Sequence, residues 1–234
     1  MVALSAPVKA LIDPVGGVPA AVEGRRWALP LAVLALCVSL SGAAGAVRWD
    51  PTSKVVSELT EAGDLARSSE NDIQDKIRQA GRVRLVGGVA AGVVRPLSVL
   101  FAALALLVAG WLWGAKAPFG KYFAAASVAM LPVALYHLVF AVAAFHAPGL
   151  TEAEALTLLP SSLRALSPDA SPELARVLGA VDFFSLWAAA MLGLGFAQAT
   201  GLSRPRALVT GFALYGAYAA VFLIGLPGLT GGVR

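Results

Sequence analysis

Three ionisable residues in or beside apolar stretches have the side chains best suited to chemistry. They are Asp182 in the run Val181-Asp182-Phe183-Phe184, His137 in Leu135-Tyr136-His137-Leu138, and Arg95 before Pro96. An acidic, basic or histidine side chain at membrane depth can indicate a proton relay, an ion path or a ligand site. Each residue also has a structural interpretation. Asp182 would cap a helix N-terminus, His137 would hydrogen-bond a neighbouring helix, and Arg95 would lie at the membrane interface.

Metal and catalytic chemistry have little support in the sequence. The chain has one cysteine, Cys37, and two histidines, which leaves too few ligands for a zinc site. It contains no phosphate-binding glycine loop, metalloprotease helix motif or nucleophile elbow. We therefore expect no enzyme activity, no metal and no cofactor. A membrane enzyme would require His137 to lie within hydrogen-bonding distance of Ser185 or Asp182.

The composition identifies the environment in which these residues must sit. Of the 234 residues, 58% are hydrophobic and 14% are charged, and the mean hydropathy is +0.76. Soluble domains carry roughly 25% charged residues. The composition excludes a cytosolic enzyme, a secreted disulfide scaffold and a disordered protein. It predicts an all-α polytopic membrane protein.

Five apolar stretches are long enough to span a bilayer as helices, which needs about 20 residues each. Together they predict a five-transmembrane-helix bundle that forms one membrane domain, with residues 1–26 as an N-terminal segment and 147–182 as an outer connector. Small residues four apart, such as Gly42 and Ala46 or Ala189 and Gly193, favour close helix packing. The predicted spans are 27–47, 97–114, 122–146, 183–202 and 207–226.

Residues 48–96 are predicted to form a charged helical segment outside the membrane. Residues 48–84 hold seven basic and seven acidic side chains. From residue 73, apolar side chains recur at helical spacing, which favours an amphipathic helix lying along the membrane and bending into the second span near Arg95. An ordinary solvated helix is the alternative.

The basic residues predict the orientation. Lys116 and Lys121, Arg204 and Arg206, and the basic residues of 1–26 all precede or join spans on one side. Short basic loops remain cytoplasmic, so we expect a cytoplasmic N-terminus in the cell inner membrane. The net charge of +4 is dispersed between apolar runs, which argues for contact with anionic lipid and against nucleic acid.

Several short motifs resemble those of one membrane-protein family. They include Asp13-Pro14 ahead of the first span, the connector from Pro118 through Gly120 and Lys121 to Phe123, and Pro132 in the next span. The most specific is Asp182-Phe183-Phe184-Ser185-Leu186-Trp187 at the start of the fourth span. In this order the chain resembles the bacterial branch of the Yip domain (Ypt-interacting protein) family.

The resemblance implies an architecture and a role without catalysis. Eukaryotic members of the family are associated with Rab-type GTPases and vesicle traffic. For this chain we expect a membrane scaffold or partner-binding subunit, with the lipid bilayer and either a membrane-protein partner or a second copy as its contacts. The alternative is a transporter or channel component that uses intramembrane polar residues. The candidate residues are Asp182, Phe184, Ser185, Trp187, Gly120, Lys121, Pro132, His137 and Arg95.

Overall fold

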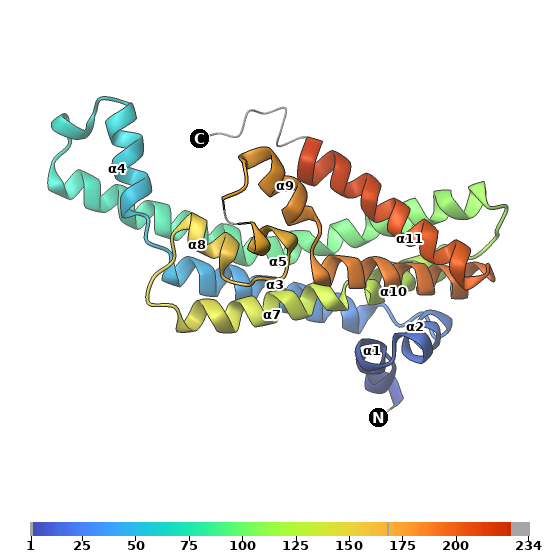
Figure 1. Cartoon of the computed structure of the whole chain (residues 1–234). Helices are drawn as coiled ribbons and strands as arrows, with labels where there is room; N and C mark the ends of the chain where they lie inside the picture. Colours follow the sequence, from blue (N-terminus) through green and yellow to red (C-terminus); the bar gives the residue numbers. More distant parts are fainter. Residues whose placement is uncertain (1, 168, 226–234) are drawn as a thin grey trace. The chain divides into compact units, whose positions relative to one another are not determined.

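The computed structural model describes residues 2–167 and 169–225, and helices dominate this part of the chain (Figure 1). The internal contacts divide the chain into two compact units. Unit 1 comprises residues 1–34, 95–136 and 160–234, and unit 2 comprises residues 35–94 and 137–159.

The helices are distributed over both units. Three long helices contribute residues to both units: α3 (Ala28–Arg48), α5 (Glu70–Leu112) and α7 (Leu131–His146). Unit 2 also contains α4 (Thr52–Glu61), the short 3-10 turn η1 (Leu65–Arg67) and α8 (Glu152–Thr157). The other elements of unit 1 are α1 (Val2–Ile12), α2 (Pro14–Glu23), α6 (Phe119–Ala129), the 3-10 turn η2 (Leu163–Leu166), α9 (Pro172–Ala180), α10 (Phe183–Thr200), α11 (Arg204–Tyr218) and the π-helical turn η3 (Ala219–Gly225).

Five helical stretches in the described residues are long and apolar enough to cross a membrane, which confirms the predicted fold class. Large apolar side chains on them face outward, for example Val93 at 76% and Phe101 at 69% exposed. Apolar surface of this kind is stable against lipid rather than water. The five stretches are Ala28–Arg48, Glu70–Leu112, Phe119–His146, Phe183–Thr200 and Arg204–Gly225.

The second of these stretches is longer than the span predicted from the sequence. The helix α5 runs for 43 residues and contains Pro96 in its interior. That is about twice the length a single crossing needs. The charged stretch after Glu70 and the predicted span 97–114 are therefore parts of one continuous helix up to Leu112.

Two other predicted spans differ in detail from the helices. The third is interrupted at Met130, where α6 ends and α7 begins, one residue before the Leu131-Pro132 pair. The fifth ends in the π-helical turn η3. Its last predicted residue, Leu226, lies outside the described residues.

Unit 1 is built around α10, which packs against α2, α6 and α11. Small residues allow these close approaches. A Cβ added to Gly195 would lie 2.7 Å from the Ala125 Cβ, and one added to Gly211 would lie 2.5 Å from the carbonyl oxygen of Ala189. The helix α10 is capped at its C-terminus by Gly201, whose φ of 76° is the left-handed conformation that glycine adopts at little cost.

Unit 2 shows the same close packing between the second half of α3 and the first half of α5. A Cβ on Gly42 would lie 2.3 Å from the carbonyl oxygen of Gly88, so the two backbones are in direct contact. Three residues before Gly42 in α3, the Ser39 hydroxyl donates to the carbonyl of Val89 at 3.0 Å. Small residues and interhelical hydrogen bonds are the usual means of joining helices in lipid.

Candidate functional site

Asp182 lies at the N-cap of α10, in the extended conformation that a capping residue adopts. One carboxylate oxygen accepts a hydrogen bond from the backbone N–H of Ser185 at 2.9 Å. The other accepts one from the hydroxyl of Ser161. The helix-capping interpretation of Asp182 is therefore confirmed. The hydrogen bond from Ser161 also attaches the start of α10 to the segment before η2.

Other hydrogen bonds converge on the same junction, which we call the α10 junction (Ser161, Ala180, Asp182, Ser185 and Tyr215). The backbone N–H of Phe183 donates to the Ser161 carbonyl at 2.9 Å. The Tyr215 hydroxyl, from α11, donates to the carbonyl of Ala180 at the end of α9. The junction thus joins α9, α10, α11 and the segment before η2 through polar contacts.

The aromatic residues that follow Asp182 contact other aromatic rings. The Phe184 ring meets the Tyr136 ring edge to face, with centroids 5.6 Å apart. The Trp187 ring lies 5.7 Å from that of Phe183, one turn earlier. Aromatic pairs in these geometries add stability beyond their buried area.

His137 belongs to unit 2 and contacts α3. Its Nδ1 lies 2.9 Å from the Ser41 hydroxyl oxygen, and Ser41 is buried. This confirms the interpretation of His137 as a residue that hydrogen-bonds a neighbouring helix. A serine beside a histidine is also the first pair of a nucleophilic site, but such a site needs a group that orients the histidine and donors for an oxyanion.

Lys121, near the start of α6, forms a salt bridge with Glu23 at the end of α2, with 2.8 Å between the charged atoms. The side-chain amide of Gln198, in α10, donates to the same Glu23 oxygen at 3.3 Å. The hydrogen bond from Lys121 lowers the pKa of Glu23 below its usual value, and the bond from Gln198 acts in the same direction. This Glu23–Lys121–Gln198 tether connects three helices of unit 1.

The remaining candidates occupy ordinary helical environments. Gly120 lies in the first turn of α6, where an added Cβ would make only van der Waals contact with Arg25. Pro132 is fully buried in the first turn of α7, where its missing N–H costs little. Arg95 is exposed in α5, and its carbonyl accepts the Ser98 hydroxyl at 2.6 Å.

The polar candidates make defined contacts in the structure. Among the described residues, no group of three histidine, cysteine or acidic side chains could hold a metal ion. Three polar pairs connect different segments: Ser41 with His137, Ser161 with Asp182, and Glu23 with Lys121. Asp182, His137 and Lys121 therefore each take part in a polar contact between two segments of one unit.

Sequence reasoning missed the partners of its own candidates. Ser41, Ser161 and Tyr215 are polar residues inside or next to apolar stretches, which was an available signal. Their pairing depends on which helices are neighbours, and a single sequence does not contain that information. Glu23 was also missed, although it is the one acidic residue close to Arg25 and Arg26.

A comparison with protein-family models finds the Yip1 domain over residues 8–226. No curated protein and no solved structure matches the chain. The matched region includes all five helical stretches and every candidate residue named above, from Arg95 to Trp187. The chain is therefore a multi-pass membrane protein that belongs to the Yip1 domain family.

Proposed function

We propose that this protein is a non-catalytic membrane scaffold that holds a membrane-protein partner or a second copy of itself. In this proposal the N-terminus is cytoplasmic and the protein resides in the cell inner membrane. The polar segment 48–84 and the short basic turns provide the contact surfaces.

The observation that carries the proposal is that a polar side chain near the spans forms hydrogen bonds within the protein. Asp182 accepts two hydrogen bonds within unit 1, from the Ser161 hydroxyl and the Ser185 amide. A carboxylate held in this way serves helix capping and attachment. These hydrogen bonds support a structural role for Asp182. In the transporter alternative, Asp182 would instead line the transport pathway.

The proposed contact surface is the charged segment within residues 48–84. In α4, Val55 and Leu59 are buried while the charged residues between and after them are exposed. In the first turns of α5, Arg78 and Asp75 form an ion pair that is exposed on both sides, at 3.6 Å. Exposed pairs contribute little to stability. These charges remain available to set partner choice and association rate.

A paired charge-neutralisation experiment tests this assignment. The full-length protein is purified in mild detergent, before and after crosslinking in membranes, and its bound partner or oligomer is quantified. The variant E58Q/E61Q removes two carboxylates from α4 and should reduce complex recovery several-fold. The control D169N/E173Q removes two carboxylates from the 147–182 connector and should leave recovery unchanged.

Two results would contradict the proposal. Wild-type protein recovered only as an uncrosslinked monomer without a partner would remove the scaffold function. Equal losses of complex recovery in the two variants would show that residues 48–84 are not the specific contact surface. The scaffold function would then depend on another surface.

A further inference from the structure

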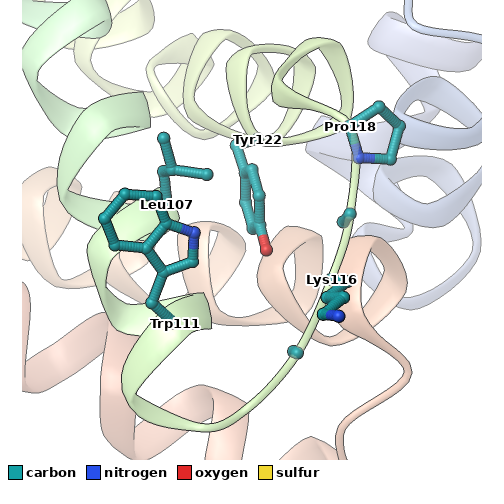
Figure 2. Close-up of a pocket in the computed structure, with 7 residues that line it drawn as sticks. Leu107, Trp111, Lys116, Pro118 and Tyr122 are labelled. Carbon is teal, nitrogen blue, oxygen red and sulfur yellow. The ribbon is translucent and has the colours of Figure 1, made fainter.

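A pocket of about 470 Å³ lies in unit 1 where the end of α5 leads into α6. Figure 2 shows the Tyr122 ring extending from α6 between Trp111 on one side and the connector that carries Lys116 and Pro118 on the other. The wall is mostly apolar, with Leu107 and Trp111 from α5 and Ala115, Ala117 and Pro118 from the connector. A ligand for this pocket must be largely apolar.

The Tyr122 hydroxyl gives the pocket a polar end. Tyr122 is fully buried, and its hydroxyl makes no hydrogen bond within the described residues. It lies close to the backbone of α5, because a Cβ on Gly110 would be 2.3 Å from the hydroxyl oxygen. A buried hydroxyl without a partner is unfavourable. A ligand that accepts a hydrogen bond at this place would remove the penalty.

Lys116 supplies a positive charge to the same pocket. The Lys116 side chain is exposed on the connector, and no salt bridge to it occurs in the described part of the chain. A tyrosine hydroxyl and an ammonium group are both hydrogen-bond donors, and the ammonium group is also a cation. The polar end therefore favours an anionic oxygen, such as one from a phosphate group.

The surroundings of the pocket favour a lipid as the source of such a phosphate group. Trp111 is 68% exposed beside the pocket, at the end of a helix long and apolar enough to cross the membrane. Tryptophan is enriched where membrane helices meet the headgroup layer. The neighbouring Trp113 donates its indole N–H to the Thr210 hydroxyl at 3.1 Å, which ties this end of α5 to α11.

We propose that this pocket binds one anionic phospholipid. The headgroup phosphate accepts a hydrogen bond from the Tyr122 hydroxyl and pairs with the Lys116 ammonium group. The start of an acyl chain lies along Leu107 and Trp111. Free phosphate shares the headgroup chemistry but would leave the apolar wall uncovered.

Thermal unfolding of the purified full-length protein tests the lipid site. The protein is held in detergent micelles doped with phosphatidylglycerol or with phosphatidylcholine, and the unfolding temperature is recorded against the lipid fraction. Binding to the folded state raises this temperature in proportion to occupancy. We expect phosphatidylglycerol to raise it in a saturable way and phosphatidylcholine to raise it far less.

The variants identify the pocket as the site. Y122F keeps the ring and removes the unpaired hydroxyl, so it should unfold at or above the wild-type temperature without anionic lipid. Both Y122F and K116Q should need about tenfold more phosphatidylglycerol for the same shift, the scale of a lost charge-assisted bond. R204Q removes one positive charge from another basic turn and should respond as the wild type does.

Three results would overturn the proposal. Y122F and K116Q could respond to phosphatidylglycerol as strongly as the wild type, or R204Q could lose as much of the response as K116Q. Inorganic phosphate alone could reproduce the shift through Tyr122, which would replace the lipid by a free anion. If Y122F fails to fold, retention of phosphatidylglycerol by K116Q, measured by native mass spectrometry, decides the question by the same criterion.

Discussion

Asp182 combines two structural tasks in one carboxylate. It satisfies a free backbone N–H at the start of α10 through Ser185, and it holds the segment before η2 through Ser161. An asparagine would preserve a capping oxygen but remove the charge, whereas an alanine would remove both. Comparing the two substitutions therefore distinguishes a need for the capping oxygen of Asp182 from a need for its negative charge.

We expect D182A to lower the free energy of unfolding by about 1–2 kcal/mol and D182N to lower it by less. SDS titration of the detergent-solubilised protein, followed by far-UV circular dichroism, measures both. Asp64 provides a matched control, because it also precedes a helical turn but its side chain makes no capping hydrogen bond. D64A should change stability by no more than about 0.5 kcal/mol. A loss in D182N as large as that in D182A would show that the charge itself is required.

The tether between Glu23 and Lys121 makes a prediction about pH. The hydrogen bond from Lys121 keeps the pKa of Glu23 in the folded protein below its usual value. A group with a lowered folded pKa stabilises the fold above its ordinary pKa, and this contribution is lost as the pH falls through the lowered value. The attachment of α2 should therefore persist at neutral pH and weaken only in acid.

An NMR titration of protein labelled at the glutamate carboxyl carbon measures the Glu23 pKa directly. K121Q should raise it toward the usual glutamate value, because the largest favourable partner is removed. R204Q removes one positive charge elsewhere and should leave it unchanged. A Glu23 pKa that is the same in K121Q and wild-type protein would contradict the tether.

Among the elements, the contact between α3 and α5 is the most sensitive to size. A Cβ on Gly88 would lie 2.8 Å from the backbone of Gly42, while one on the adjacent Gly87 meets nothing within 4 Å. Both glycines lie inside α5 and pay the same helix cost. G88A should destabilise the protein by about 1–3 kcal/mol through overpacking.

The control G87A should be neutral or stabilising by up to about 1 kcal/mol, since alanine is the better helix former. The same SDS titration distinguishes the two variants. Equal stability for G88A and G87A would show that α3 and α5 do not pack at this point.

The elements also show what the sequence can and cannot predict. Hydropathy and length predict all five helical stretches, because each one must satisfy its backbone internally. The same pattern does not show that α5 continues through Pro96, since a proline favours but does not require a break. The spacing of small residues identified Gly42 and Gly193, and both make close contacts with another helix.

At the scale of side-chain pairs, the sequence predicts less. It gives helix capping for Asp182 and an interhelical hydrogen bond for His137 as one of two interpretations of each residue. It does not identify Ser161 or Ser41 as their partners, since these depend on helix neighbours. The pocket around Tyr122 is equally hidden, because its hydroxyl is buried against Gly110 from a different helix.

For the whole molecule, the central claim is that its long helices cross a bilayer and place their connectors on alternate sides. The predicted topology puts the charged segment 48–84 outside and the turn between the second and third spans in the cytoplasm. Lys54 in α4 and Lys121 in α6 report these two positions. Cys37 is the only cysteine in the chain and is buried, so C37A provides a background for labelling.

Labelling of single cysteines in intact and permeabilised cells tests this claim most directly. In the C37A background, we predict that K54C reacts with a membrane-impermeant maleimide in intact cells and that K121C reacts only after permeabilisation. Reaction of both positions from the same side of the membrane would contradict the account.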